Sequence, residues 1–298
     1  MAILSAFLLD ALFGEPPVHV HPVVWMGKYL GAMRARLPKA FLAGVFAWGL
    51  GALLCTGIAW ATQVVIHSML PAPLAWFVQG ILLKPLFAWR ALREAVLQIT
   101  QAERLEEKRR LLSWHLVSRD TGDLSEGEVN GAVIESLTEN MCDSVVAPLF
   151  WFLVGGLPLA ALYRFANTAD AMWGYHTPEL EWFGKWAARA DDVLNFIPSR
   201  LTALALLAAA MLQRLDVRSA WRVWRRDGSK TPSPNAGQPM SVAAGALRVN
   251  LTKRGAYSLG AEFPMPTASD VVRALRWCGV AVWGYVVAAS ALEWLIIR

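Results

Sequence analysis

The chain has 298 residues, of which 56% are hydrophobic and only 17% are charged. Soluble domains contain about 25% charged residues, so this chain has too few polar side chains to cover a globular surface. The composition excludes a disordered chain, a secreted disulfide scaffold and an ordinary cytosolic enzyme, and it indicates an integral membrane protein. The net charge of +5 is typical of the cytoplasmic loops of such a protein and does not indicate nucleic-acid binding.

The first residues do not match the pattern of a cleavable signal peptide. Met1–Leu9 is apolar, but no basic region precedes it and Asp10, Pro16 and Pro17 follow it. We therefore expect this segment to be retained. The three cysteines lie far apart in the sequence, which favours buried thiols over a disulfide framework or a zinc site.

Five apolar segments are candidates for membrane helices, each of which needs about 20 mostly apolar residues. They are Ala40–Ile66, Leu74–Trp89, Ser144–Tyr163, Leu201–Gln213 and Trp277–Ile297. Lys84 and Pro85 interrupt the second segment, and Gly155, Gly156 and Pro158 break the third. The fourth is too short alone and must borrow residues around Pro198, where we expect a further irregularity. We predict an all-α polytopic fold with about 4–6 membrane segments, some broken or re-entrant, in a single membrane-embedded catalytic domain over residues 1–298.

The charges of the polar segments predict which side of the membrane they occupy. Residues 14–39 carry a net charge of +3 and residues 214–276 a net charge of +7, whereas residues 90–143 carry −4. The positive-inside rule places the two basic segments in the cytoplasm, and two preceding spans return residues 90–143 there. Counting complete spans would put residues 164–200 outside. A re-entrant course of the broken segments would keep them on the cytoplasmic side.

A stripe of carboxylates precedes the third apolar segment. Glu135, Glu139 and Asp143 are spaced four residues apart, so a helix would carry them on one face. Ser125 and Glu128 fit a capping box at the start of that helix. A solvated helix face is the simpler alternative. However, the stripe runs directly into apolar sequence, where carboxylates are costly unless they are paired, hydrated or bound to a cation, which favours a role in Mg²⁺ or substrate binding.

Two further polar clusters follow, with the sequences Asn167-Thr168-x-Asp170 and Arg189-x-Asp191-Asp192-x-x-Asn195-x-x-Pro198-x-Arg200. Adjacent acids with nearby Asn side chains supply the oxygen ligands that Mg²⁺ prefers. The arginines are suited to phosphate. On spacing alone, a helix start with ordinary ion pairs is equally consistent with this pattern.

The most basic segment contains the loop Pro232-Ser233-Pro234-Asn235-Ala236-Gly237. The preceding Gly228–Thr231 is not a phosphate loop of the P-loop type, because the first glycine is missing and two prolines prevent a helix from following. A basic loop that anchors a phosphate and a plain cytoplasmic linker are both possible interpretations. His19 and His21, in a proline-rich stretch, are typical of capping or hydrogen-bonding residues rather than metal ligands.

Taken together and in this order, the polar strings resemble the CobD/CbiB family of cobalamin-biosynthesis membrane proteins. The resemblance covers essentially the whole chain. It rests on Leu9-Asp10, Gly14-Glu15-Pro16, His21-Pro22, Ser118-Arg119-Asp120-Thr121, Glu135-Ser136-Leu137-x-Glu139-Asn140, Asp143-x-Val145-Val146-Ala147-Pro148-Leu149-Phe150-Trp151, Gly155-Gly156-Leu157-Pro158, the two clusters above, Gly174-Tyr175, Pro232–Gly237 and Ala244–Leu247. Two strings depart from the family pattern: Lys230-Thr231 stands where a His is usual, and Leu251–Tyr257 stands where a Gly-Gly-rich stretch is usual.

The resemblance implies an adenosylcobinamide-phosphate synthase. This enzyme joins a propionate carboxylate of adenosylcobyric acid to the amine of (R)-1-aminopropan-2-ol O-phosphate, or of ethanolamine phosphate. Amide formation from a carboxylate is uphill in water, so ATP and Mg²⁺ are expected with the corrinoid substrate. The expected location is a bacterial inner membrane, with the site open to the cytoplasm, in contact with lipid, with no nucleic-acid partner, and with homo-oligomers or other membrane-bound cobalamin-assembly enzymes as possible partners.

The resemblance also distributes roles among the polar residues. Catalysis is assigned to Glu135, Glu139, Asp192 and Arg200. Substrate or phosphate binding is assigned to Arg119, Asp120, Asn140, Asn167, Asp170, Arg189, Asn195, Ser233 and Asn235. Metal binding is assigned to Glu139, Asp143, Asp191 and Asp192.

Two other classes of function fit the same sequence features. Broken segments and intramembrane carboxylates also mark transporters, so a non-catalytic transporter or an AmpE-like sensor of an anionic solute is the alternative. Its weakness is the lack of repeat symmetry between the two halves of the chain. A scaffold for later membrane-bound enzymes is compatible with catalysis.

Overall fold

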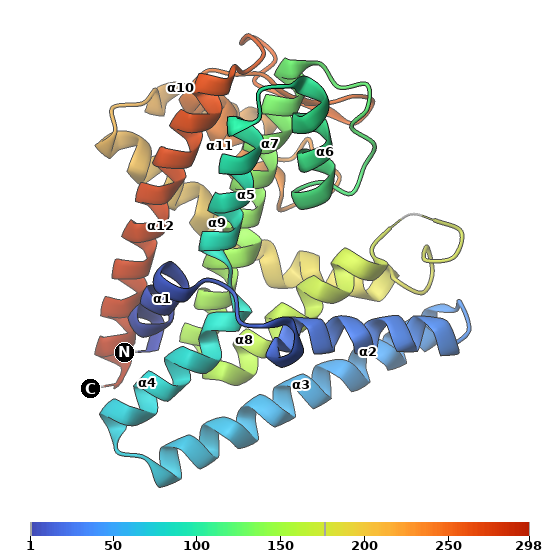
Figure 1. Ribbon diagram of the computed structural model, residues 1–298, viewed down its shortest axis with the longest axis vertical. Helices are drawn as coiled ribbons and strands as arrows, with labels where there is room; N and C mark the ends of the chain where they lie inside the picture. Colours follow the sequence, from blue (N-terminus) through green and yellow to red (C-terminus); the bar gives the residue numbers. More distant parts are fainter. Residues whose placement is uncertain (1, 176, 298) are drawn as a thin grey trace. The chain divides into compact units, whose positions relative to one another are not determined.

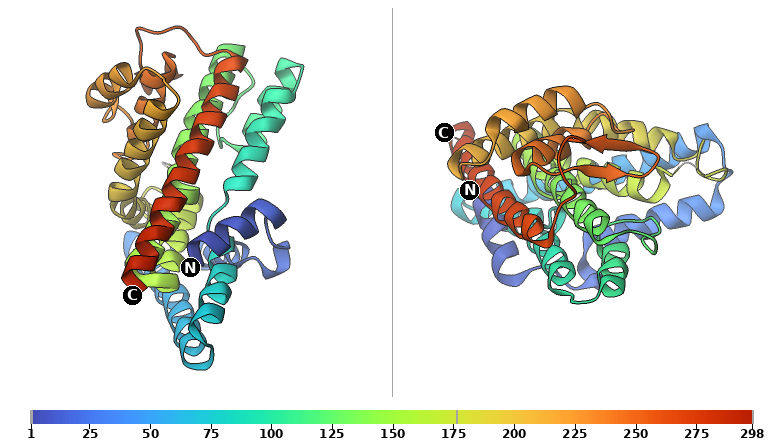
Figure 2. Two further views of the ribbon diagram at one scale, coloured as in Figure 1. Left: turned by 90° about the vertical axis from the view of Figure 1, so that its left-hand side faces the viewer. Right: turned by 90° about the horizontal axis from the view of Figure 1, so that it is seen from above.

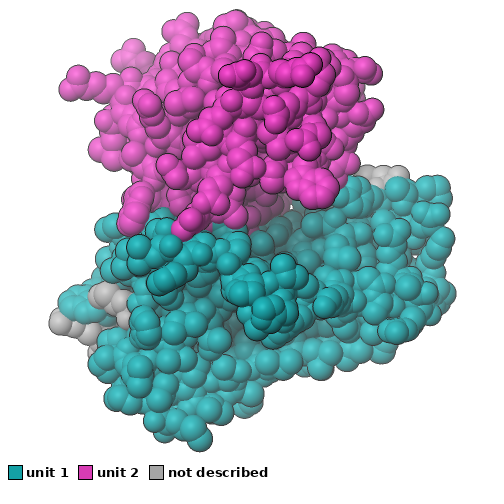
Figure 3. All heavy atoms as spheres, viewed as in Figure 1, with its two compact units in different colours: residues 1–88, 147–195, 286–298 teal, residues 89–146, 196–285 magenta. Residues whose placement is uncertain are grey.

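The computed structural model describes residues 2–175 and 177–297. Its elements are almost all helices, and they form two compact units, which Figure 3 shows in two colours. Unit 1 comprises residues 1–88, 147–195 and 286–298, and unit 2 comprises residues 89–146 and 196–285. Each unit is described separately below, and the single catalytic domain over residues 1–298 stays a prediction.

Unit 1 is built from apolar helices that pack in pairs. Helix α3 packs along α8, α1 along α4, and α2 along α8, and these helices are labelled in Figure 1. Leu30, Phe165 and Trp173 are fully buried in its core. The elements of the unit are α1 (Ala2–Phe13), the 3-10 turn η1 (Val18–Val20), α2 (Pro22–Arg36), α3 (Phe41–Met69), α4 (Ala72–Leu83), the 3-10 turn η2 (Lys84–Leu86), α8 (Ala147–Trp173), the first part of α9 (Lys185–Leu212) and the last part of α12 (Ala268–Ile297).

Helix α8 is broken where the sequence predicted. Gly155 (φ −154°, ψ 28°) and Gly156 (φ 67°, ψ −156°) leave the helical conformation, and the positive φ of Gly156 favours a residue without a Cβ atom. The break leaves the Leu157 N–H without a helical acceptor. That N–H donates instead to Oε1 of Gln63 in α3, at 2.8 Å. A Cβ atom on residue 156 would lie 2.3 Å from the same oxygen.

Helix α9 runs from Lys185 to Leu212 without a break. The short fourth segment therefore borrows residues on its N-terminal side, as predicted, but the expected irregularity at Pro198 is wrong. Proline has no N–H group, so the carbonyl of Leu194 loses its helical donor. The indole N–H of Trp151 donates to that carbonyl at 3.1 Å. This side-chain substitute satisfies the carbonyl and allows the helix to continue.

Lys84 interrupts the second apolar segment and is buried in an ion-pair network. Its Nζ lies 2.9 Å from both Asp10 Oδ1 and Glu15 Oε1. The other carboxylate oxygen of Glu15 lies 2.9 Å from Nε2 of His21, whose Nδ1 accepts the Val23 N–H and so caps α2. Both ring nitrogens of His21 are thus engaged, which confirms its capping role. A buried lysine requires such partners.

Glu293 is a second buried charge within an apolar helix, and it caps α1. Its two carboxylate oxygens accept the N–H groups of Ala2 and Ile3, at 2.6 and 3.1 Å. The first N–H groups of a helix have no intrahelical acceptor and carry partial positive charge. The negative charge of the carboxylate and the partial positive charge of the helix N-terminus therefore stabilise each other.

Unit 2 surrounds α7 with helices and one small hairpin. Helices α5, α6 and α11 and strand β1 all contact α7, and α10 packs against α11. Strands β1 and β2 are antiparallel, with Lys253 opposite Tyr257. Figure 2 shows the hairpin from above. The elements are α5 (Trp89–Gln101), α6 (Leu105–His115), α7 (Glu126–Met141), the π-helical turn η3 (Cys142–Val146), the last part of α9, α10 (Val217–Asp227), α11 (Gly237–Leu247), β1 (Leu251–Lys253), β2 (Tyr257–Leu259) and the first part of α12.

The start of α7 confirms the predicted capping box. The Ser125 side chain accepts the Glu128 N–H, and the Glu128 side chain accepts the Ser125 N–H at 2.8 Å. At its other end, α7 passes into the π-helical turn that contains Asp143. A π turn holds more residues per turn than an α-helix. Asp143 is the second residue of this turn, and its sharing of one face with Glu135 and Glu139 stays a prediction.

The predicted fold class is confirmed. Five helices are long and apolar enough to cross a membrane: Phe41–Met69, Ala72–Gln101, Glu126–Trp173, Lys185–Leu212 and Ala268–Ile296. The hairpin β1–β2 is the only sheet among the described residues. Cys55, Cys142 and Cys278 form no disulfide among the described residues; Cys142 and Cys278 are buried, as predicted, whereas Cys55 is half-buried.

Candidate functional site

The most deeply buried candidate of unit 2 is Glu135, in the middle of α7. The residue is 4% exposed, and its Oε2 lies 3.7 Å from Nη2 of Arg119. Its Oε1 has no hydrogen-bond partner among the described residues. A buried carboxylate oxygen without a donor is costly. The structure thus joins two of the predicted site residues and leaves one acceptor open.

The hairpin β1–β2 supplies two residues that the sequence reasoning missed. The hydroxyl of Tyr257 interacts with the Glu135 carboxylate, and Lys253 contributes a positive charge to the same surroundings. Burial raises the pKa of Tyr257, and the negative charges of Glu135 and Glu139 add to the effect. The departure of Leu251–Tyr257 from the family pattern was the signal that could have directed attention to this hairpin.

A cleft of about 280 Å³ opens beside Arg119. One wall comes from the loop before α7 and the other from the turn of the hairpin. Its lining residues are Arg119, Asp120, Asp123, Leu124, Glu128, Thr252, Lys253 and Arg254. The guanidinium of Arg254 is bound to Glu128 and donates from Nη2 to the Asp123 carbonyl at 3.2 Å. The cleft therefore has one neutralised arginine, two other cationic side chains, Arg119 and Lys253, and two further carboxylates, Asp120 and Asp123.

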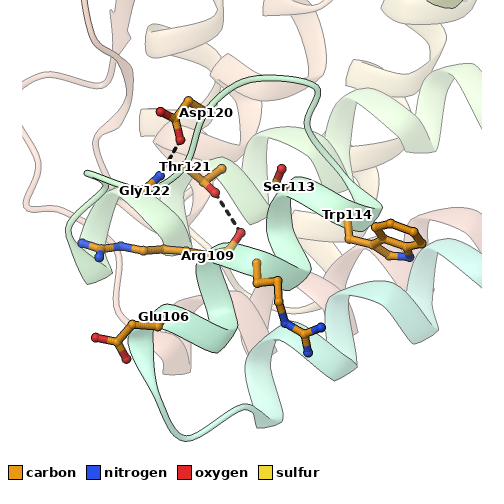
Figure 4. A pocket seen from close by; sticks show the side chains of 8 residues that line it. Glu106, Arg109, Ser113, Trp114, Asp120, Thr121 and Gly122 are labelled. Carbon is orange, nitrogen blue, oxygen red and sulfur yellow. Dashed lines mark hydrogen bonds between the residues drawn. The ribbon is translucent and has the colours of Figure 1, made fainter.

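A second cavity, of about 450 Å³, lies on the α6 side of the same loop. Figure 4 shows how the loop closes onto itself and onto α6. Oδ1 of Asp120 accepts the Gly122 N–H at 2.9 Å, and the Thr121 hydroxyl donates to the Arg109 carbonyl at 2.9 Å. Asp120, predicted to bind substrate, thus shapes the loop that presents Arg119.

Two polar strings that are far apart in the sequence meet at Arg200. Its Nη1 donates to Oδ1 of Asn235 at 2.8 Å, and its Nη2 donates to the Pro234 carbonyl at 3.2 Å. The Ser199 hydroxyl also donates to Asn235 Oδ1, at 3.2 Å, and the Asn235 N–H donates to Oγ of Ser233. The structure therefore brings together three predicted residues: Arg200, Ser233 and Asn235. Asn140, in contrast, donates to the Ser136 carbonyl of its own helix at 2.9 Å.

In unit 1 the predicted residues gather around Asp191. Oδ1 of Asp191 accepts from Nδ2 of Asn167 at 3.3 Å, and Oδ2 accepts from Nδ2 of Asn195 at 3.0 Å. Asn195 is itself held by the Tyr163 hydroxyl, which donates to its Oδ1 at 2.9 Å. Tyr163 was missed by the sequence reasoning, because one tyrosine in an apolar stretch gives no signal.

Two further acids, Asp170 and Asp192, lie close enough to repel the charge of Asp191. Asp192 lies 3.8 Å from Nη1 of the exposed Arg189. Gly174 packs directly on Asp170: a Cβ atom at residue 174 would lie 2.1 Å from Asp170 Oδ1 and 2.8 Å from its carbonyl oxygen. The Gly174-Tyr175 string therefore preserves the position of a predicted site carboxylate.

These arrangements can be compared with known proteins. The family model described as CobD/Cbib protein matches residues 3–278. The chain belongs to this family. A relative from Methanothermobacter thermautotrophicus, named "Probable cobalamin biosynthesis protein CobD", is 42% identical over 260 residues, covering 87% of this chain and 86% of the relative. A relative of the same name from Thermococcus kodakarensis is 41% identical over 292 residues, covering 97% of this chain and 94% of the relative.

A relative from Dehalococcoides mccartyi, "Cobalamin biosynthesis protein CobD", is 41% identical over 273 residues, covering 87% of this chain and 86% of the relative. No solved structure matches the chain. The predicted membership of the CobD/CbiB family is thus confirmed. The individual roles assigned to the site residues stay predictions.

One strong charge network of this family member lies outside the predicted sites. Asp227, at the end of α10, is fully buried and accepts from Arg226, from Lys230 and from the Gly260 N–H. Burial alone would raise the pKa of Asp227, but these donors outweigh it and lower the pKa to about 2. Lys230, the lysine of the rejected phosphate-loop string, is therefore committed to Asp227, with Nζ 2.6 Å from its Oδ1.

Proposed function

We propose that this protein is an ATP-dependent amide synthase of cobalamin biosynthesis. Its substrates are adenosylcobyric acid and (R)-1-aminopropan-2-ol O-phosphate, or ethanolamine phosphate, and its product is adenosylcobinamide phosphate. Membership of the CobD/Cbib protein family over residues 3–278 and the names of the relatives support a role in cobalamin biosynthesis. The individual reaction is the one that the family resemblance implies.

One observation carries the mechanism: the polar strings of the family meet inside the fold. Arg119 meets Glu135 in unit 2, Arg200 meets Asn235 in unit 2, and Asn167 and Asn195 both donate to Asp191 in unit 1. The convergence of distant carboxylates, amides and guanidinium groups supports a site for charged substrates.

The proposed reaction has two steps. A propionate oxygen of the corrin attacks the γ-phosphorus of ATP, and ADP leaves. The neutral amine then attacks the acyl carbon, phosphate leaves, and the nitrogen loses a proton. In this proposal Arg119 and Arg200 neutralise phosphate charge, and the open oxygen of Glu135 accepts the proton of the amine.

The donor set fits Mg²⁺ that arrives with the nucleotide. Among residues 2–175 and 177–297, no group of three or more His, Cys, Asp or Glu side chains is arranged to hold a metal ion. Mg²⁺ commonly uses one or two carboxylates together with substrate phosphates rather than a protein cage. Asp191 and Asp192, or Glu139 and Asp143, would be its protein ligands. When bound, the ion neutralises phosphate charge.

The proposed location is a bacterial inner membrane, with the site facing the cytoplasm. The supporting features are the five helices suited to crossing a membrane and the basic segments 14–39 and 214–276, which the positive-inside rule assigns to the cytoplasm. ATP and the corrinoid intermediates are available in that compartment.

The test uses membranes that contain the full chain, supplied with adenosylcobyric acid, aminopropanol phosphate and Mg-ATP. We expect corrinoid amide and ADP to appear together, and Glu139→Gln and Asp192→Asn to abolish both while the protein still inserts. Glu103→Gln is the matched control, because Glu103 is exposed on the surface of unit 2. Normal turnover by both site variants would refute the acidic-site mechanism. Flux of a corrinoid without product would instead support the transporter alternative.

A further inference from the structure

The cleft beside Arg119 is small and strongly charged. Its volume of about 280 Å³ lies at the lower end of the range for ligand pockets, about 300–1,000 Å³. A corrin ring is far too large for this space, whereas a small phosphorylated molecule is suited to it. The size therefore excludes the corrin ring from this cleft.

Three basic and three acidic side chains line the cleft, and two of the basic ones form no ion pair with the lining acids. Arg254 is bound to Glu128 and to the Asp123 carbonyl, and Asp120 is turned onto the Gly122 N–H. Lys253 is exposed and forms no ion pair with a described residue. Arg119 lies 3.7 Å from Glu135, which is longer than a hydrogen bond. Its N–H donors are therefore not used by that carboxylate.

The surroundings of Arg119 carry the opposite charge on their buried side. Oε1 of Glu135, in a residue that is 4% exposed, lacks a hydrogen-bond partner among the described residues. Glu139 adds a second negative charge nearby, and the Tyr257 hydroxyl interacts with Glu135. Glu135 is buried and is not among the residues that line the cleft.

The cleft lining carries charges of both signs, which match the two ends of one molecule. An amino-alcohol phosphate carries a phosphate and an ammonium group separated by two carbon atoms. We propose that the cleft beside Arg119 binds this phosphorylated amine, with Arg119 and Lys253 on its phosphate and the lining carboxylates of Asp120 and Asp123 on its ammonium group. The assignment rests on the proposed function and deepens it, because it separates the amine subsite from the sites of ATP and the corrinoid.

The decisive variant is Lys253→Ala, since Lys253 is exposed and its loss leaves no buried group unpaired. We expect the KM for the phosphorylated amine to rise about tenfold to a hundredfold, the usual effect of losing one charge-assisted contact. The KM values for ATP and adenosylcobyric acid should stay within threefold. The preference for the phosphorylated over the unphosphorylated amine should fall by the same factor, and Lys253→Arg should restore it.

Lys39→Ala is the matched control, because Lys39 is an exposed lysine of unit 1 in a surface pair with Glu179. Titration calorimetry of the purified full chain with aminopropanol phosphate separates this inference from the proposed function. Binding that depends on Lys253 without amide formation would refute the proposed function and leave the site standing. Amide formation with a Lys253-independent KM, or a change in the KM for ATP instead, would overturn the site.

Discussion

Two carboxylates, the half-buried Asp191 in unit 1 and the buried Glu135 in unit 2, have different hydrogen-bond partners. Asp191 receives a side-chain amide on each oxygen, from Asn167 and Asn195. Glu135 has a guanidinium at 3.7 Å from one oxygen and no hydrogen-bond donor from the described residues on the other. Both lie in helices suited to crossing a membrane, where an unsatisfied carboxylate is expensive.

The difference indicates two kinds of role. A carboxylate with a donor on each oxygen is fixed in position, and Tyr163 extends this support by holding Asn195. A carboxylate oxygen without a donor from the protein can accept a hydrogen bond from another molecule, which in an enzyme is the substrate. We therefore interpret Asp191 as a positioned group and Glu135 as a reacting or substrate-contacting group.

The first prediction concerns Glu135→Gln, which preserves the shape of the side chain and removes its ability to accept a proton. If Glu135 acts as general base, kcat should fall by about 10²- to 10⁴-fold, with the KM for ATP little changed. Steady-state amide formation in membranes measures both quantities, beside the exposed control Glu103→Gln. A Glu135→Gln variant that keeps kcat within tenfold of the wild type would show that the open oxygen has no chemical role.

The second prediction concerns Asn195→Ala, which removes one donor to Asp191 and the acceptor of Tyr163. Asn195 is 2% exposed, so the groups that it leaves behind stay buried. We expect the free energy of unfolding to fall by about 2–3 kcal/mol, with a smaller loss of about 1 kcal/mol for Tyr163→Phe. Thermal unfolding in detergent measures both. The contrast fails if Asn195→Ala melts like the wild type and yet loses as much turnover as Glu135→Gln.

Much of the fold follows from local chemistry, which explains why the sequence predicted it. The apolar stretch of α3, the glycine pair that breaks α8 and the Ser125–Glu128 capping box depend on residues close in the chain. The error at Pro198 has a different origin. The indole N–H of Trp151 replaces the N–H donor that proline lacks. Trp151 lies 43 residues before Leu194, whose carbonyl it binds, so the residues around Pro198 do not predict this contact.

The same distinction applies to the candidate site. Carboxylate spacing indicated Glu135 and Asp191, and the family resemblance indicated Arg119, Arg200 and Asn235. Which oxygen stays open depends on tertiary partners that spacing does not determine. Tyr257 was missed because a short hairpin of unremarkable composition places it against Glu135. The sequence did not predict a role for Lys253. Only the structure shows that Glu128 pairs with the neighbouring Arg254 and not with Lys253.

The last prediction extends the contrast to Asp227, a carboxylate that is satisfied on both oxygens and has no assigned chemistry. Its pKa is lowered to about 2 from the usual 3.8, since donors from Arg226, Gly260 and Lys230 outweigh the effect of burial. A lowered pKa contributes stability above the unfolded-state value, and this contribution is lost as the pH falls from about 4 towards 2. We expect Asp227→Asn to cost about 1–2 kcal/mol at pH 7, allowing for screening by solvent, and progressively less as the pH falls towards 3. Thermal unfolding of both proteins at the two pH values measures the change. Because Asp227 is a positioned group like Asp191, its loss should act through stability, and turnover per folded molecule should stay within threefold; a larger loss would place this network in the site.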